Sequence, residues 1–249
     1  MYSNPMFTNV ETTSAYATEN TATYQGITLK TLLLLGVAGI SGILGGLLLY
    51  KTADLSYYMI ALIVSLVAGL IAIFVGRSNP DKAMPCGIIY SVAEGVVLGM
   101  ITLIADLYYQ GIAVIAVAST AVIFVVCLAM FACGAMRNVS KLRSLLILTF
   151  CSIIAVSLLL LVLTLFNVDG SASVIKGYFG IVMFIELLYV LYGCIMLFFN
   201  FNEATSYVQG GATKNFEWVA AFGLLVSILY IYLEMLRLLL YIAQFTNRD

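Results

Sequence analysis

From Lys30 onward the chain alternates between long apolar runs and short polar breaks. Each run is close to the ~20 residues that an α-helix needs to cross ~30 Å of hydrocarbon. Because lipid offers no partner for backbone polar groups, such runs predict helices, and their continuous apolar character argues against the alternating strands of a barrel. The predicted helices span residues 31–50, 57–76, 85–107, 112–135, 144–166, 174–199 and 217–243.

The first 29 residues differ from the rest, because they are polar and contain no Lys or Arg. They lack the basic start and the early apolar core of a secretory signal. Over the whole chain of 249 residues, 63% are apolar and 9% are charged, whereas soluble domains have about 45–50% and about 25%. We therefore expect an all-α integral membrane protein, with a polar cytoplasmic tail at 1–29 and a seven-helix transmembrane domain at 30–249.

The basic residues predict the orientation of these helices. Only Lys51, Lys176 and Arg248 lie on the side that follows the odd-numbered helices. The amino-terminal side and the loops after helices two, four and six hold Lys30, Arg77, Lys82, Arg137, Lys141, Arg143 and Lys214. Because basic residues gather on the cytoplasmic face of a membrane, we expect a cell-membrane protein with a cytoplasmic amino terminus and an outside carboxyl terminus.

The composition also excludes several classes of function. The chain has no histidine, which removes His-based triads, HExxH zinc proteases and His-ligated haem. We therefore expect neither an enzyme nor a bound cofactor. A net charge of −1 without a basic block gives no basis for nucleic-acid binding. The five cysteines form no CxxC pattern and are interpreted as apolar thiols.

Four charged residues lie inside predicted helices, namely Glu94, Glu186, Glu234 and Arg237. A charge costs about 2.5–3.5 kcal/mol at a helix centre on insertion scales, so each of them is a functional hypothesis. Glu234 and Arg237 are one turn apart and can pair directly. One face of the last helix, which should point to the bundle interior or to a water-filled cavity, carries Ser227, Tyr230, Glu234, Arg237 and Tyr241.

These residues leave more than one interpretation open. Glu234 and Arg237 can form an ion pair that only fixes helix packing, and Glu94 and Glu186 can be neutral carboxyl groups bonded to nearby carbonyls. Alternatively, carboxylates and tyrosine hydroxyls supply the hard oxygen ligands that Ca²⁺ prefers. The same groups can relay protons. The residue types alone do not choose between these uses.

Two motifs resemble a known family, the Bax inhibitor family in its bacterial YccA-like branch. The more specific one is the last helix, with Glu217–Leu224 followed by Tyr232–Leu238. The third helix, with Pro85, Tyr90, Glu94-Gly95 and Leu98-Gly99, is similar to the family's third-helix motif. This resemblance implies seven helices with the last one at the centre, surrounded by the other six.

The resemblance also implies a function, because members of this family are described as calcium-leak channels whose opening responds to pH. In them a carboxylate of helix six and one of helix seven form a latch, with an arginine of helix two nearby. By motif, Glu234 takes the helix-seven position and is the residue expected to face the ion, and Arg77 is the match for the arginine. The helix-six position is Asn200, an amide that cannot titrate, which implies a weakened pH response.

Other functions remain open at this point. The YccA-like branch implies a non-conducting regulator that binds a membrane protease or another membrane partner, through the tail at 1–29 and the loop at 200–216. A secondary transporter would need discontinuous helices. Only the first helix is rich enough in glycine to raise that question, and we interpret its glycines, from Gly36 to Gly46, as a packing face.

Overall fold

A computed structural model describes residues 21–52, 55–133, 144, 148 and 179–246. Within these residues the secondary structure is helical, apart from one isolated β-bridge. Six of the described helices are long and apolar enough to cross a membrane. The prediction of a multi-pass, all-α membrane protein is therefore confirmed for six of the seven predicted spans. Apart from Ser144 and Leu148, the predicted helix at 144–166 lies outside the described residues, as does most of the tail at 1–29.

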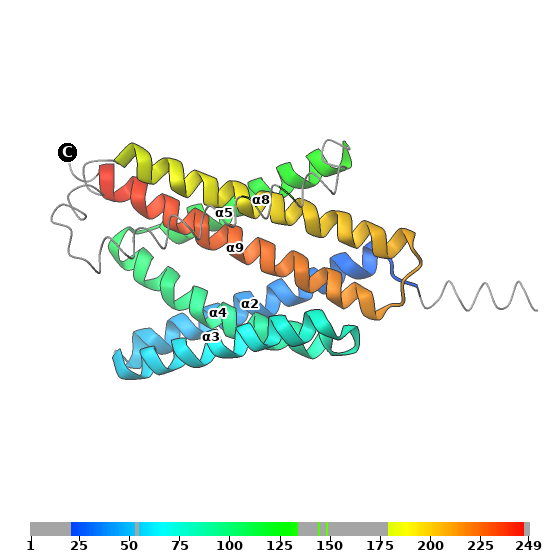
Figure 1. Ribbon diagram of the computed structural model, residues 1–249. Coiled ribbons are helices and arrows are strands. Elements are labelled where there is room, and N and C mark those ends of the chain that lie inside the picture. The colour runs from blue at the N-terminus through cyan, green and yellow to red at the C-terminus, as the bar shows by residue number, and fades with distance from the viewer. Residues whose placement is uncertain (1–20, 53–54, 134–143, 145–147, 149–178, 247–249) are drawn as a thin grey trace, which may run out of the picture.

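The long helices run roughly along one direction and form a bundle, as Figure 1 shows. In chain order they are α2 (Tyr24–Thr52), α3 (Leu55–Ser78), the short 3-10 helix η1 (Pro80–Lys82), α4 (Ala83–Tyr108), α5 (Ile112–Ala132), α8 (Phe179–Gln209) and α9 (Asn215–Thr246).

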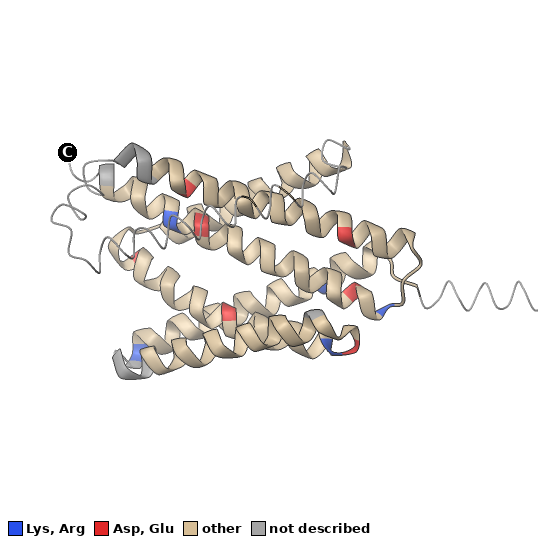
Figure 2. Cartoon of the chain, viewed as in Figure 1, with Lys and Arg blue, Asp and Glu red and all other residues tan. Residues whose placement is uncertain are grey.

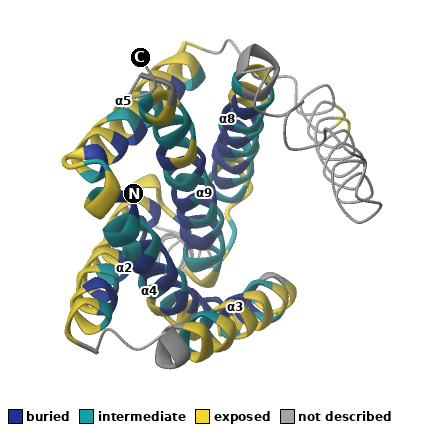
Figure 3. Ribbon diagram, turned by 90° about the vertical axis from the view of Figure 1, so that its left-hand side faces the viewer, coloured by how far each residue is buried: buried dark blue, intermediate teal, exposed yellow. Residues whose placement is uncertain are grey.

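The last helix, α9, lies at the centre of the bundle (Figure 3). It packs against α2, α4, α5 and α8, while α3 packs mainly on α4. Leu225, Ile231 and Leu236 of α9 are fully buried. The central position that the resemblance implied is thus confirmed for the helices that the structure describes. Because four helices pack against α9, many of its side chains, Glu234 among them, lie inside the protein.

Glycines allow α2 and α4 to approach each other closely. A Cβ atom at Gly99 of α4 would overlap the carbonyl oxygen of Gly42, and a Cβ at Gly42 would lie 3.1 Å from the Gly95 oxygen. Small residues permit this kind of backbone contact between membrane helices. The interpretation of the glycine face as a packing surface is confirmed at Gly42, whereas Gly36 and Gly39 face open space.

Two helices extend further than their apolar runs predicted. Helix α2 begins at Tyr24 rather than at residue 31, because the Thr23 hydroxyl oxygen accepts a hydrogen bond from the Gly26 amide at 3.0 Å and so caps the first turn. Helix α8 continues to Gln209 rather than ending at 199. Its polar last turns keep their side chains bonded within the helix, as with Thr205, which donates to the Phe201 carbonyl.

Candidate functional site

The site lies between α8 and α9, where three of the four charged residues predicted inside the membrane come together, namely Glu186, Glu234 and Arg237. Arg237 Nη1 donates to Glu234 Oε2 at 2.9 Å, so the predicted pairing of these residues is confirmed. Only 3% of the Glu234 side chain is exposed, against 43% for Arg237. Figure 2 shows how few charges the long helices carry along their length.

Glu186 of α8 belongs to the same cluster. It is 6% exposed, and its Oε2 atom is buried with no hydrogen-bond partner among the described residues. It interacts electrostatically with both Glu234 and Arg237 across the helix interface. The Arg237 guanidinium also lies over the Tyr189 ring, one turn along α8, with 6.0 Å between the guanidinium carbon and the ring centroid. One guanidinium therefore serves two buried carboxyl groups.

Tyrosines complete the lining of this interface. The rings of Tyr192 on α8 and Tyr230 on α9 meet edge to face, with centroids 5.5 Å apart, and the Tyr230 hydroxyl faces the Glu234 carboxylate. A Cβ atom at Gly193 would lie 2.7 Å from Ile231, so a larger residue there would push the helices apart. The polar stripe predicted on α9 thus faces α8, at an interface that supplies two carboxyl groups and phenolic hydroxyls.

Such a set of oxygens suits a hard cation in passage. Among the residues that the structure describes, no group of three or more His, Cys, Asp or Glu side chains could hold a metal ion. The interface therefore offers carboxylate and phenolic oxygen atoms from α8 and α9.

Asn200 does not lie beside Glu234, which corrects the pairing that the resemblance implied. Its Nδ2 atom donates to the Ser227 hydroxyl and to the Gly223 carbonyl, at 2.5 and 3.0 Å. Ser227 precedes Glu234 by two helical turns, about 10 Å along α9. In this fold, the α9 residue that pairs with Asn200 is Ser227, and the pair contains no titratable group. The resemblance had placed Glu234 at this position by motif.

Two other candidates lie away from the cluster. Glu94 of α4 faces α3, since a Cβ atom at Gly69 would lie 3.8 Å from its Oε2 atom. Arg77 lies in the last turn of α3, and its side chain is outside what the structure describes. Its neighbour Gly76 packs against Phe222 of α9, which is 12 residues, or about 18 Å of helix, before Glu234. The backbone at Arg77 therefore lies at a different level of the bundle.

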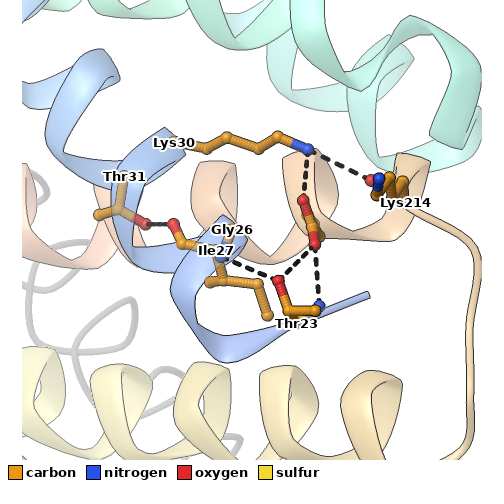
Figure 4. Close-up of polar contacts among 7 residues, drawn as sticks. Thr23, Gly26, Ile27, Lys30, Thr31 and Lys214 are labelled. Carbon is orange, nitrogen blue, oxygen red and sulfur yellow. Dashed lines mark hydrogen bonds and ion pairs between the residues drawn. The ribbon is translucent and has the colours of Figure 1, made fainter. Parts of the chain in front are cut away.

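A second polar cluster, which the sequence did not reveal, joins the start of α9 to the start of α2 (Figure 4). Glu217, 3% exposed, accepts hydrogen bonds from Lys30 Nζ at 2.6 Å, from the Thr23 amide at 2.8 Å and from the Thr23 hydroxyl at 3.0 Å. The Lys30 ammonium also donates to the Lys214 carbonyl and lies 4.9 Å from the Trp218 ring centroid.

The backbone of this second cluster is shaped around the Glu217 carboxylate. A Cβ atom at Gly26 would overlap both of the carboxylate oxygens, so only glycine leaves room for them. The preceding residues add two backbone contacts, a bridge between Thr21 and Thr213 and a 2.7 Å hydrogen bond from the Ala22 amide to the Ala212 carbonyl. In the sequence, Lys30 contributes only to the predicted orientation of the helices, and Glu217 only to the last-helix motif of the family resemblance.

Comparisons with known proteins agree with the fold. The family model described as "Bax inhibitor 1 like" matches residues 4–244, almost the whole chain. No curated protein and no solved structure matches it significantly.

Proposed function

The chain belongs to the Bax inhibitor 1 like family, and from that premise we propose that it conducts cations, with Ca²⁺ as the expected substrate, along the interface between α8 and α9. The observation that supports this proposal is the pair of buried carboxyl groups at Glu186 and Glu234, one of which has a buried oxygen without a described partner. Charged side chains are costly in a membrane and usually belong to a substrate or ion path.

The residues of the interface have distinct parts in this proposal. Glu234 and Glu186 supply carboxylate oxygens that replace part of the hydration shell of the cation, and the hydroxyl of Tyr230 adds a neutral oxygen. Two carboxylates and one guanidinium give the cluster a net charge of −1 when all three are ionised, which attracts cations without holding them tightly. Transport needs this balance, because a conducted ion must both bind and leave.

Calcium flux into proteoliposomes that contain the purified protein tests the proposal. Loss of an interaction with a charged group is worth about 1.5–3 kcal/mol, so Glu234→Gln should reduce the flux about tenfold or more. Glu94→Gln is the matched control, because Glu94 is also a glutamate inside a membrane span but faces α3. Equal flux through parent, Glu234→Gln and control would remove the α8–α9 interface from the mechanism. Absence of flux in the folded parent would favour the non-conducting regulator that binds a membrane partner.

A weak pH response is part of the same proposal. The contact of Asn200 with Ser227 contains no acid, so it cannot supply the coupled titration of two carboxyl groups that would make flux depend steeply on pH. We expect Asn200→Asp alone to leave the flux profile between about pH 6 and 8 shallow, and Asn200→Asp with Ser227→Asp to steepen it. A steep profile in the parent protein would show that other groups control opening, with the interacting carboxyl groups of Glu186 and Glu234 as the candidates.

We further propose that the end of the bundle with Lys30, Lys82 and Lys214 faces the cytoplasm. These lysines lie at one end, where Lys30 meets the turn before α9 and Asp81 accepts a hydrogen bond from Asn215. The positive-inside rule then sets the orientation. Single cysteines at Lys214 and Gln110, both exposed and at opposite ends, test it by labelling intact cells. An impermeant reagent should label Gln110→Cys, and labelling of Lys214→Cys alone would reverse the assignment.

A further inference from the structure

Arg237 occupies an unusual place for a residue beside a cation path. Its guanidinium contacts Glu234 on its own helix at 2.9 Å and lies 6.0 Å from the ring centroid of Tyr189 on α8. A positive charge at this point sits where a passing cation would meet the Glu234 carboxylate. The arginine and the cation therefore need the same oxygen atoms.

The two partners of this ion pair are buried to very different degrees. The Glu234 side chain is 3% exposed, and the Arg237 side chain is 43% exposed. Long basic side chains near helix ends extend toward the membrane surface and keep their charged group hydrated. Arg237 can thus leave Glu234 at small cost, whereas Glu234 is fixed in the interior.

Glu186 adds the second, independent observation. This residue is 6% exposed, and its buried Oε2 atom has no hydrogen-bond partner among the described residues. An unpaired buried carboxyl oxygen costs free energy, and the Arg237 guanidinium donates to Glu234 and not to this oxygen. The cluster therefore has one cation fewer than its two acids can bind.

We infer that Arg237 is a tethered competitor for the cation site formed by Glu186 and Glu234, so that a divalent cation binds both carboxylates only when the guanidinium moves away. This inference deepens the proposed function, because it concerns the regulation of the same site. In the resting state the guanidinium neutralises Glu234 and excludes other cations. A divalent cation that displaces it gains Glu234 and the unsatisfied Glu186 together.

Equilibrium binding of Mn²⁺ to the full-length protein in detergent tests the inference, with electron paramagnetic resonance to measure free Mn²⁺. Removing the competing charge in Arg237→Gln should tighten Mn²⁺ binding by up to about fivefold, because the cation no longer has to break an ion pair with a partly exposed member. Adding Glu186→Gln to that variant should abolish the gain. Lys51→Gln is the matched control, since it removes one positive charge from an exposed position at the end of α2 and should leave the affinity unchanged.

Several results would overturn the inference. These are unchanged Mn²⁺ affinity in Arg237→Gln, a gain that survives Glu186→Gln, and an equal gain in Lys51→Gln. Arg237→Met serves as a second neutral variant that keeps most of the side-chain volume. A neutral variant that folds only when millimolar Ca²⁺ is present would support the inference, because the cation then replaces the guanidinium. One that stays unfolded with Ca²⁺ present would contradict it.

Flux measurements separate this inference from the proposed function. Tighter Mn²⁺ binding in Arg237→Gln together with no Ca²⁺ flux in any variant would retain the site and reject conduction. Flux that depends on Glu234, together with unchanged Mn²⁺ affinity in Arg237→Gln, would retain conduction and reject the competitor.

Discussion

Helix α9 carries one buried glutamate near its start and another in its second half, and the protein treats them in opposite ways. Glu217 accepts three hydrogen bonds from Lys30 and Thr23. Glu234 has an ion pair with Arg237, whose side chain is 43% exposed, and it shares that cation with Glu186. The two glutamates are equally buried, since each is only 3% exposed. The difference therefore lies in the partners, and under the proposed function it separates a carboxylate that fixes structure from one that binds the passing cation.

The length of α9 explains where each type of site lies. Its 32 residues extend over about 48 Å, more than the ~30 Å of hydrocarbon in a bilayer. Glu217, in the first turn, lies near the membrane surface, where a complete set of donors can come from the ends of other elements. Glu234 lies further along the helix, and the donors that the structure describes for it, Arg237 and Tyr230, are side chains of α9 itself.

The largest effect on stability should follow loss of the better-partnered acid. Glu217→Gln leaves the Lys30 ammonium, whose side chain is 20% exposed, without its counter-charge, and removing one partner of a buried ion pair costs about 3–5 kcal/mol. Thermal unfolding in detergent measures this change. Calcium flux through the protein that remains folded should equal that of the parent. A lower flux at full stability would show that Glu217 acts in conduction as well.

A somewhat smaller loss should follow from filling the space that Gly26 leaves for the carboxylate. Gly26→Ala places a methyl group on the Glu217 oxygens, and overpacking of this kind costs about 1–3 kcal/mol. Gly36→Ala is the matched control on the same helix, where the added atom meets open space. Because alanine favours helix by up to about 1 kcal/mol over glycine, the control should be neutral or stabilised. Equal melting temperatures for the two variants would contradict the inference that Gly26 leaves necessary room for the Glu217 carboxylate.

Between the two glutamates, the pair of Asn200 and Ser227 should give an intermediate result. Ser227→Ala removes two hydrogen bonds, the one from Asn200 and its own to the Gly223 carbonyl, but leaves the bond from Asn200 to that carbonyl. The free energy of unfolding should therefore fall by about 1–2 kcal/mol. Thermal unfolding of Ser227→Ala against the parent measures it. A loss as large as that of Glu217→Gln would mean that the middle of α9, and not its start, holds the bundle together.

The smallest change in stability should come from Glu234→Gln, although its effect on flux is expected to be large. The Arg237 side chain, 43% exposed, can exchange its partner for water, and pairs with such exposed members contribute about 0–1 kcal/mol. Thermal unfolding of this variant beside Glu217→Gln tests the comparison directly. Equal destabilisation by the two substitutions would place both glutamates in structural roles.

The sequence predicted the spans well and the contacts between them less completely. Apolar runs locate helices because lipid requires continuous apolar surface, and the pairing of Glu234 with Arg237 followed from their spacing on one helix. The end of α8 was missed because Asn200 resembles a polar break. Its partner Ser227 lies on another helix. No local pattern shows that such a side chain is satisfied inside the bundle.

The sequence marked Glu186 as a candidate only because it is a charged residue inside a predicted helix. Its place opposite Glu234 and Arg237 depends on the register of α8 against α9, which the close approach at Gly193 helps to set. Lys30 and Glu217 are 187 residues apart. Neither periodicity nor motif spacing relates residues at that separation, so their contact emerged only from the folded chain.

That separation has a consequence for the order in which the protein is made. At about 5–20 residues per second, a ribosome needs about 10–40 s after Lys30 before Glu217 emerges. During this time α2 is in the membrane without the central helix α9 and without the Glu217 carboxylate, which bonds Lys30 and Thr23 at the start of α2. The contact between Lys30 and Glu217 thus forms only after α9 has begun to emerge. A chain released before residue 215 lacks both the central helix and this contact. Such unfinished chains should be more readily recognised by membrane quality control than finished ones.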